Sequence, residues 1–191
     1  MSTIAVVLAA DAGNGFEQPK YLTLVHGVPM LQRVVDEALS WPVDEVVVVL
    51  GSDAETIVES ITFKDTTVLI DPEWSEGGAS PLRAALDMIS RTSESSLVVL
   101  ARGDQPGIDA DLVGELIEVA AETHTDAVVP KFRYAQGWPV VLSPRLWTYF
   151  LGLEDSVDVH AVITTHAASV EEVWVDHIAP PILATLDDLT R

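Results

Sequence analysis

The stretch of residues 8–20 carries the side chains and glycines best placed to do chemistry. It leaves an apolar run that predicts a buried strand, contains two glycines, and ends in a Pro-Lys pair. In α/β proteins, a glycine-bearing loop after the first strand commonly binds phosphate through its backbone N–H groups, and a lysine adds a positive charge. The pattern therefore predicts a nucleotide-binding loop. Its candidate binding residues are Leu8, Ala9, Ala10, Gly13, Gly15 and Lys20.

Two acidic residues in the same loop argue in the opposite direction. Asp11 and Glu17 would repel a triphosphate bound there. We therefore keep two hypotheses of different kinds: an enzyme that acts on a nucleotide, and a binding or regulatory protein that has the same fold but lacks the reaction. Lys20, Asp104 and Arg83 favour the enzyme, whereas the two acids favour the binding protein.

A second candidate site follows the apolar run at residues 97–101. Asp104 stands just beyond that run, in the segment Gly103-Asp104-Gln105-Pro106. A carboxylate at the end of a buried strand is well placed to hold Mg²⁺ near a phosphate, because Mg²⁺ prefers hard oxygen ligands. The alternative is a turn or helix-capping aspartate before Pro106. In the functional interpretation, Asp104 is catalytic, and Gln105 and Pro106 contact the substrate.

Residues 71–80 form a third candidate loop. The segment is too long and too rich in glycine for a minimal connector, and long loops on rigid scaffolds are more often functional. The alternative is a turn with Trp74 packed over it as a lid. The candidate nucleotide-binding residues of this region are Asp71, Gly77, Ser80 and Arg83.

The segment Gly137-Trp138-Pro139 is a candidate substrate contact. It presents either backbone and ring surface to a substrate, or only a turn that opens an edge strand. His160 and His166 lie six residues apart on a helical pattern and do not share a face well, so we interpret both as structural or exposed.

Alternating strands and helices are needed to position these loops. Runs rich in Val, Ile and Leu predict strands at residues 4–9, 45–50, 67–70, 97–101, 127–129, 139–142 and 170–175. Helices are predicted from Pro29, after a cap at Asp53, from Pro81, after a cap at Asp109 or Asp111, and near residues 145–151 and 157–166. This order predicts a three-layer α/β/α sandwich with a Rossmann-like, mostly parallel sheet. Its first strand should be central, and the loops at 10–20, 71–80 and 102–108 should lie close together.

The composition limits the class of protein. A chain of 191 residues that is 48% hydrophobic fits one domain, and we take residues 1–191 as that domain. A net charge of −20 disfavours nucleic acid and anionic membranes as partners. The sequence contains no cysteine, no basic segment typical of a signal peptide, and no apolar run near the roughly 20 residues of a membrane helix. We therefore expect a cytoplasmic protein.

Taken together, these segments resemble the MobA-like nucleotidyltransferases, which include the molybdenum cofactor cytidylyl- and guanylyltransferases. The family's opening motif, LAAGxSxRMGxxK, keeps its register from Leu8 to Lys20 without a gap. The other segments similar to family motifs are Gly27-x-Pro29-Met30-Leu31 (GxPLL), residues 71–84 (NPxWxxG…SSLRAG), Asp104-Gln105-Pro106 (the metal-binding DQP) and Gly137-x-Pro139-Val140 (GHPV).

The departures from the family's motifs fall on the residues that do chemistry. In register, Asp11 stands at the family's glycine, Gly13 at its serine, and Gly15 at the arginine that would contact the triphosphate. Trp138 replaces the histidine of GHPV. The GDxGAR segment, associated with a second acidic metal contact, is present only as residues 154–159, where Asp155 is the candidate second metal ligand.

The resemblance implies a fold of the nucleotide-diphospho-sugar transferase type and a nucleotidyltransferase reaction. An acceptor's terminal phosphate would attack the α-phosphorus of an NTP, either CTP or GTP, and expel pyrophosphate, with Mg²⁺ bound mainly by Asp104. The implied acceptor is a small phosphorylated molecule such as molybdopterin. A sugar phosphate or another small acceptor is a further hypothesis, because the same sheet serves those enzymes.

Arg102 stands where the family's fourth strand usually carries an apolar residue. An isolated charge at the end of a buried strand is strongly destabilising, so one hypothesis is a structural ion pair with Asp11 or Asp104. The other is that the guanidinium reaches into the site and replaces the missing loop arginine, because a forked donor suits phosphate.

Overall fold

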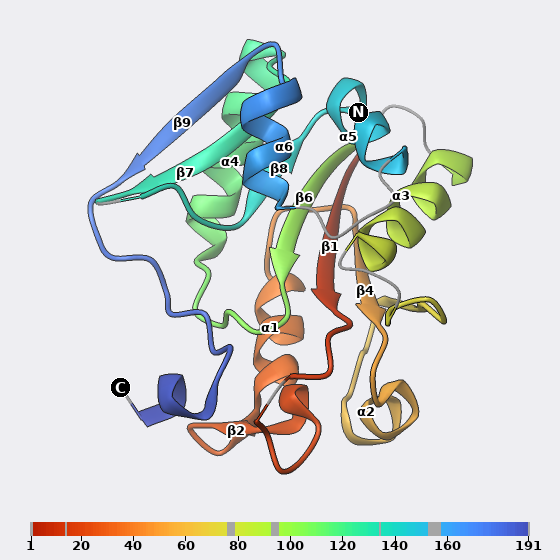
Figure 1. Ribbon diagram of the computed structural model, residues 1–191. Coiled ribbons are helices and arrows are strands. Elements are labelled where there is room, and N and C mark those ends of the chain that lie inside the picture. The colour runs from red at the N-terminus through yellow and green to blue at the C-terminus, as the bar shows by residue number, and fades with distance from the viewer. Residues whose placement is uncertain are drawn as a thin grey trace.

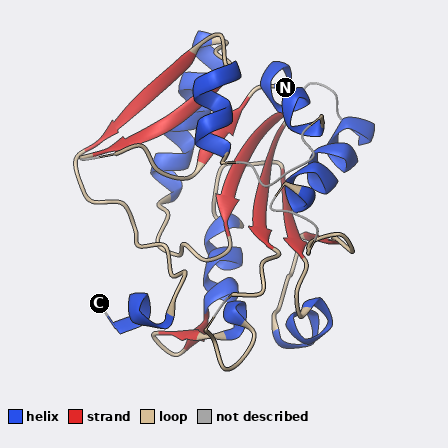
Figure 2. Cartoon of the chain, viewed as in Figure 1, coloured by secondary structure: helices blue, strands red, loops and turns tan. Residues whose placement is uncertain are grey.

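The chain folds around one sheet that has helices on both faces (Figure 1). The structure is a computed structural model that describes residues 2–13, 15–75, 79–92, 96–133, 135–152 and 158–190. In these residues, seven strands form the sheet in the order β5-β4-β1-β6-β8-β7-β9. Figure 2 shows the sheet as the middle layer between the helices, which confirms the three-layer α/β/α sandwich.

The strands lie close to the predicted positions. They are β1 (Thr3–Ala9), β4 (Glu45–Leu50), β5 (Thr67–Ile70), β6 (Leu97–Arg102), β7 (Ala127–Phe132), β8 (Val140–Leu142) and β9 (Val170–Val175). Within the described part of the chain, β8 is the strand that runs antiparallel to its neighbours. Because β8 pairs with both β6 and β7, it is an interior strand, and the suggestion that Pro139 opens an edge strand is wrong.

Two apolar cores bury the two faces of the sheet. One face packs against α1 (Met30–Ala38), α2 (Ala54–Ser60) and α4 (Ala110–Thr123), and the other against α3 (Ser80–Thr92), α5 (Pro144–Leu151) and α6 (Val159–His166). Alternate residues of β1 serve the two cores: Val7 faces the first and Val6 the second. Burial on both faces explains why the strands read as apolar runs without strict alternation.

Helix starts differ from the predictions at two positions. Pro29 precedes α1 as its cap residue and belongs to β3 (Val28–Pro29), which forms a small hairpin with β2 (Leu24–Val25). Asp53 precedes α2, but its φ is +56° and its carboxylate accepts from the Ser52 hydroxyl instead of capping the helix. Asp109 does cap α4, because its carboxylate accepts from the backbone N–H of Asp111.

The topology creates a crevice between β1 and β6. From β1 the chain adds β4 and then β5 on one side, and it crosses to the other side of β1 to form β6. Such a reversal of strand order leaves room for a ligand beyond the carboxyl ends of the two strands. Leu8 pairs with Arg102 in register, so the loops after β1 and β6 start side by side. None of the helices in the described residues is long and apolar enough to cross a membrane.

Candidate functional site

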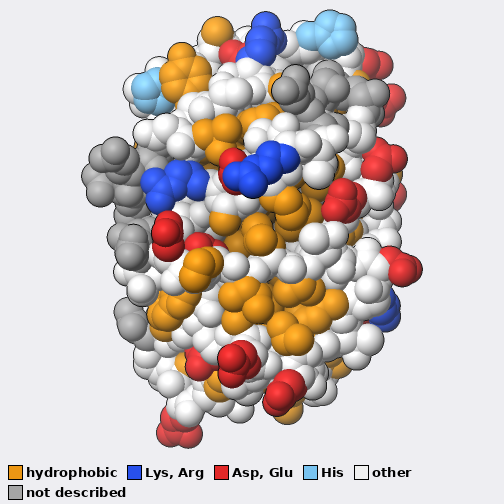
Figure 3. Space-filling model, turned by 90° about the vertical axis from the view of Figure 1, so that its right-hand side faces the viewer, with side chains coloured by type: hydrophobic (Ala, Val, Ile, Leu, Met, Phe, Trp, Pro, Cys, Tyr) orange, Lys and Arg blue, Asp and Glu red, His pale blue; other side chains and the backbone are white. Residues whose placement is uncertain are grey.

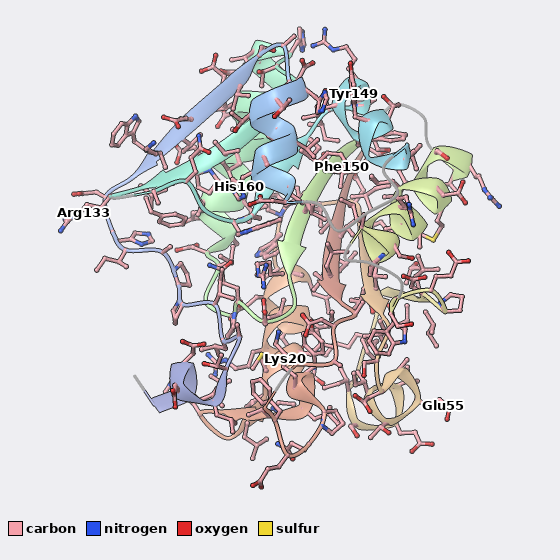
Figure 4. The ribbon with its side chains drawn as sticks, in the orientation of Figure 1. Lys20, Glu55, Arg133, Tyr149, Phe150 and His160 are labelled. Carbon is pink, nitrogen blue, oxygen red and sulfur yellow. The ribbon has the colours of Figure 1, made fainter. Side chains whose placement is uncertain are left out.

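A buried lysine links the two loops that leave β1 and β6. Lys20 begins the short 3₁₀ helix η1 (Lys20–Leu22), and its side chain is only 4% exposed. Its Nζ donates to Asp104 Oδ2 at 2.8 Å and to both carboxylate oxygens of Asp11 at 3.1 Å. Figure 4 shows Lys20 beyond the arrowheads of β1 and β6. The structure thus joins the lysine and the aspartate that the sequence placed 84 residues apart.

Arg102 also binds Asp104 through two hydrogen bonds. Its Nε donates to Asp104 Oδ1 at 2.8 Å, and its Nη2 donates to Oδ2 at 2.9 Å. The Asp104 side chain is 2% exposed, whereas that of Arg102 is 33% exposed and lies 5.9 Å from the ring centroid of Trp138. The first hypothesis for Arg102, an ion pair with Asp104, is therefore confirmed. The guanidinium also lines the cavity described below, so the two hypotheses do not exclude each other.

These contacts shift the pKa values of the groups in the network. Burial would raise the pKa of Asp104, but the hydrogen bonds and charges of Arg102 and Lys20 outweigh it and hold that pKa below its usual range. Burial likewise opposes the charge of Arg102, yet Asp104 raises the pKa of this guanidinium. Burial and the nearby charge of Asp11 raise the pKa of Tyr21 well above its usual value, so its hydroxyl stays protonated and donates to Asp11 at 3.0 Å.

A cavity of about 560 Å³ opens at this network. Three of the candidate loops contribute to its wall, through Asp11, Trp74 and Asp104, so the predicted convergence of these loops is confirmed. The amino end of α3 adds Pro81 and Leu82. A volume of this size is typical of small-molecule sites.

Two glycines let the backbone approach the network closely. Gly13 has a φ of +64°, and a Cβ there would lie 2.5 Å from the Cβ of Lys20. A Cβ on Gly103 would lie 2.7 Å from that of Ala9, while its N–H donates to the carbonyl of Leu8 at 2.8 Å. Gly103 therefore extends the pairing of β6 with β1 and sets Asp104 beside Lys20.

The candidate residues after β6 are buried against a late segment of the chain. The Gln105 side chain donates to the carbonyl of Pro180 at 2.7 Å, and the N–H of Leu183 donates to the carbonyl of Asp104 at 2.8 Å. Gln105 is 3% exposed and Pro106 is also buried, and neither is among the residues that line the main cavity.

The remaining candidates fall in different places. Leu8 and Ala10 line the cavity, and Ala9 is the buried last residue of β1. Ser80 begins α3 and is buried, and Arg83 is half-buried one turn later.

Asp71 lies on a smaller cavity of about 410 Å³ on the other side of Trp74, where its carboxylate accepts from the N–H of Glu73. Gly77 and Asp155 lie outside the described residues.

Trp138 and His160 form one wall of the main cavity. Their rings meet edge to face at 5.2 Å, and the Nε2 of His160 lies 3.0 Å from the carbonyl oxygen of Gly137. Interpreting His160 as merely structural or exposed missed this position, which is at the first turn of α6 (Figure 4). Its neighbour Asp158 also lines the cavity and caps α6 through the N–H groups of His160 and Ala161. The signal was available, because an aspartate two residues before His160 predicts a helix start there.

The side chains that the structure describes at this site do not form a ready-made site for a protein-bound Mg²⁺. Arg102 and Lys20 already engage both oxygens of Asp104, and Lys20 and Tyr21 engage those of Asp11. Among the described residues, no group of three or more His, Asp or Glu side chains is placed to hold a metal ion. The expected role of Asp104 as the principal Mg²⁺ ligand stays a prediction, and a bound ion would have to compete with Lys20 and Arg102 for this carboxylate.

Comparison with known proteins places the chain in a family. The model of the MobA-like NTP transferase domain matches residues 5–170. The chain belongs to this family. The crystal structure of Rv0371c from Mycobacterium tuberculosis H37Rv is similar, with a TM-score of 0.88 and 26% identity over 100% of this chain and 96% of that one. A second structure of that protein is a complex with manganese.

The curated relatives align with a smaller share of this chain than the solved structures do. The bifunctional protein GlmU from Aquifex aeolicus is 31% identical over 57% of this chain and 24% of its own length. Nicotine blue oxidoreductase from Paenarthrobacter nicotinovorans is 31% identical over 59% of this chain and 54% of its own length. The chain thus matches about a quarter to a half of these relatives. One of these relatives is named as an oxidoreductase, so similarity in sequence does not by itself fix the reaction.

Proposed function

We propose that this chain is a nucleotidyltransferase that moves a nucleoside monophosphate from CTP or GTP to a small phosphorylated acceptor such as molybdopterin. Membership of the MobA-like family supports the reaction class. The observation that carries the proposal is the pair of basic groups, Lys20 and Arg102, fixed on Asp104 beside the cavity at the β1–β6 crevice. Fixed positive charge is what a departing pyrophosphate needs.

In this proposal, the nucleotide phosphates lie between the loop after β1 and the amino end of α3. Backbone near Ala10 and the start of α3 near Ser80 supply N–H donors, and Arg83 adds charge from the next turn. An oxygen of the acceptor phosphate bonds to the α-phosphorus while the bond from that phosphorus to pyrophosphate breaks. Arg102 and Lys20 stabilise the negative charge that pyrophosphate carries away.

Other residues contribute shape in the same proposal. The Trp138 ring gives a flat apolar wall beside Gly137 and Pro139, and the buried Gln105 and Pro106 hold the loop that carries Asp104. Mg²⁺ belongs to the proposal as the ion that accompanies the NTP substrate, since the carboxylate of Asp104 is already engaged.

The test combines binding and turnover. A thermal-shift panel of CTP, GTP, ATP and UTP identifies the nucleotide, because a ligand that binds only the folded state stabilises it by about 2.7 kcal/mol at roughly 100 times its Kd. Release of pyrophosphate is then measured with molybdopterin and, as the alternative acceptor, a sugar phosphate. We expect release that depends on the acceptor and falls at least about a hundredfold in Arg102→Gln. Arg91→Gln, on the exposed last turn of α3, is the matched control and should retain the activity.

A binding or regulatory protein without transfer activity is the second candidate, and Asp11 favours it. Its half-exposed carboxylate lines the cavity where phosphates would enter. We expect Asp11→Asn to tighten NTP binding about tenfold, because it removes a repulsion on the order of 1–2 kcal/mol and keeps an oxygen for Lys20 and Tyr21. Glu17→Gln, which is exposed on the same loop, should change the affinity much less.

The outcomes separate the two candidates. Turnover by the unmodified chain supports the enzyme. NTP binding without pyrophosphate release from any acceptor, in both the unmodified chain and Asp11→Asn, supports the binding protein. Asp11→Asn is preferable to placing an arginine at Gly15, because Gly15 has a φ of +89° that an arginine would strain.

A further inference from the structure

Both oxygens of the Asp104 carboxylate already accept hydrogen bonds from cationic side chains. Oδ1 accepts from Arg102 Nε, and Oδ2 accepts from both Lys20 Nζ and Arg102 Nη2, at 2.8 to 2.9 Å. A divalent ion would have to displace a bidentate guanidinium from an aspartate that is 2% exposed. Charge-assisted, bidentate pairs are among the strongest side-chain hydrogen bonds, so that displacement is unfavourable.

Arg102 also faces the place where a ligand would bind. Its contacts with the described residues use two N–H donors of the guanidinium, which has five. The side chain is one-third exposed, lines the main cavity and lies near the ring face of Trp138. Donors therefore remain for a phosphate oxygen that enters the cavity.

We infer that Arg102 occupies the place of the divalent cation in this site. In this arrangement the site binds phosphate-bearing ligands without a protein-bound metal, and Asp104 is a positioning residue that anchors the guanidinium. The part of the inference that concerns phosphate rests on the proposed function. The part that concerns the metal does not, because it depends only on the contacts of Asp104.

The charge balance agrees with this assignment. Arg102 and Lys20 together supply two positive charges beside Asp104, as one divalent ion would. A guanidinium stays charged at every physiological pH and presents a planar fork of donors to phosphate. Asp11 and Asp104 balance the two bases.

The inference predicts that removing the guanidinium turns Asp104 into a metal ligand. Mn²⁺ is titrated into the protein, and the broadening of the Trp138 indole N–H signal is followed by NMR, since Trp138 lies beside Arg102. We expect the unmodified chain and Asp104→Asn to need the same Mn²⁺ concentration to halve this signal. Arg102→Gln should need at least about ten times less. The double variant Arg102→Gln with Asp104→Asn should lose that gain.

Controls keep the result specific. The indole of Trp174, which is 73% exposed on the edge strand β9, reports Mn²⁺ bound loosely to the acidic surface and should broaden equally in all variants. If Asp104→Asn does not fold, the comparison of the unmodified chain with Arg102→Gln at Trp138 and Trp174 still decides the question. Early broadening of Trp138 in the unmodified chain, or no gain in Arg102→Gln, would overturn the inference.

A second measurement tests the phosphate part. The Kd values for CTP and GTP are compared in EDTA and in Mn²⁺. For the unmodified chain we expect values within about threefold of each other, and for Arg102→Gln a loss of at least about tenfold in EDTA that Mn²⁺ restores. If the unmodified chain binds neither nucleotide, the proposed function fails while the Mn²⁺ titration still stands. A Kd in the unmodified chain that improves tenfold with Mn²⁺, and does so only while Asp104 is present, overturns the inference.

Discussion

Asp104 is the charged partner that Lys20 and Arg102 share. We predict that Asp104→Asn lowers the free energy of unfolding at pH 7 by about 2–3 kcal/mol, because Lys20 and Arg102 lose their shared charged partner in a buried setting. The partial exposure of Arg102 and the remaining contact of Lys20 with Asp11 keep the loss below the upper range for buried pairs. Denaturant unfolding measures it. Asp36→Asn, which breaks an exposed pair with Lys64, is the matched control and should cost less than about 1 kcal/mol.

The same pair makes this stability depend on pH. The pKa of Asp104 is lowered in the folded state, so its contribution is fully present above the unfolded pKa of about 4 and is lost as the pH falls through the folded value. The difference in unfolding free energy between the unmodified chain and Asp104→Asn should therefore shrink below about pH 4. A difference that stays constant down to pH 3 would show that the carboxylate's charge is not what stabilises the pair.

At this scale, the sequence predicted which loops carry the site, but it left open whether Arg102 pairs with Asp11 or with Asp104. The motifs placed Lys20 and Asp104 in two loops that were predicted to converge, and the two side chains meet there. The direction of the Arg102 guanidinium depends on a turn at Gly103 and on the Trp138 ring, which local spacing does not encode. The place of His160 in the cavity wall was missed because it depends on contacts with Trp138 and with Gly137, which is 23 residues earlier in the sequence.

At the scale of elements, the loop after β1 depends on Gly13. We predict that Gly13→Ala lowers the free energy of unfolding by about 2–3 kcal/mol, because the new Cβ combines a strained backbone with a contact of 2.5 Å to the stem of Lys20. Gly15→Ala is the matched control. Its φ is +89° but its surroundings are open, so it should cost only about 1 kcal/mol. Equal losses in the two variants would mean that Lys20 moves away freely.

The elements themselves were largely predictable from apolar runs and helical spacing. Strands rich in Val, such as β4 after its exposed Glu45, are apolar because both faces of the sheet are covered. The β2–β3 hairpin was not predicted, since its two-residue strands are too short for any periodicity to show. The interior, antiparallel place of β8 was missed because pairing partners far apart in sequence leave no local pattern.

At the scale of the whole molecule, the net charge of −20 makes self-repulsion a general property of the fold. Figure 3 shows acidic side chains at several places around one face. We predict that the unfolding temperature at pH 7 rises by several degrees between about 10 mM and about 300 mM NaCl, because salt screens this repulsion. At a pH near the pI of about 4.2 the same salt should have little effect, which calorimetry checks. A fall in the unfolding temperature at pH 7 would show that local ion pairs outweigh the overall charge.

The balance of Asp11 and Asp104 against Lys20 and Arg102 has a consequence for how fast a ligand arrives. These four side chains have no net charge, so their electrostatic potential is weak at a distance. The acidic surface around them repels anions. A nucleotide therefore gains nothing from the site until it touches it, and its encounter with the mouth of the cavity is slower than diffusion alone allows. The affinity of such a site for a ligand is therefore set mainly by a slow dissociation rate and not by a fast association rate.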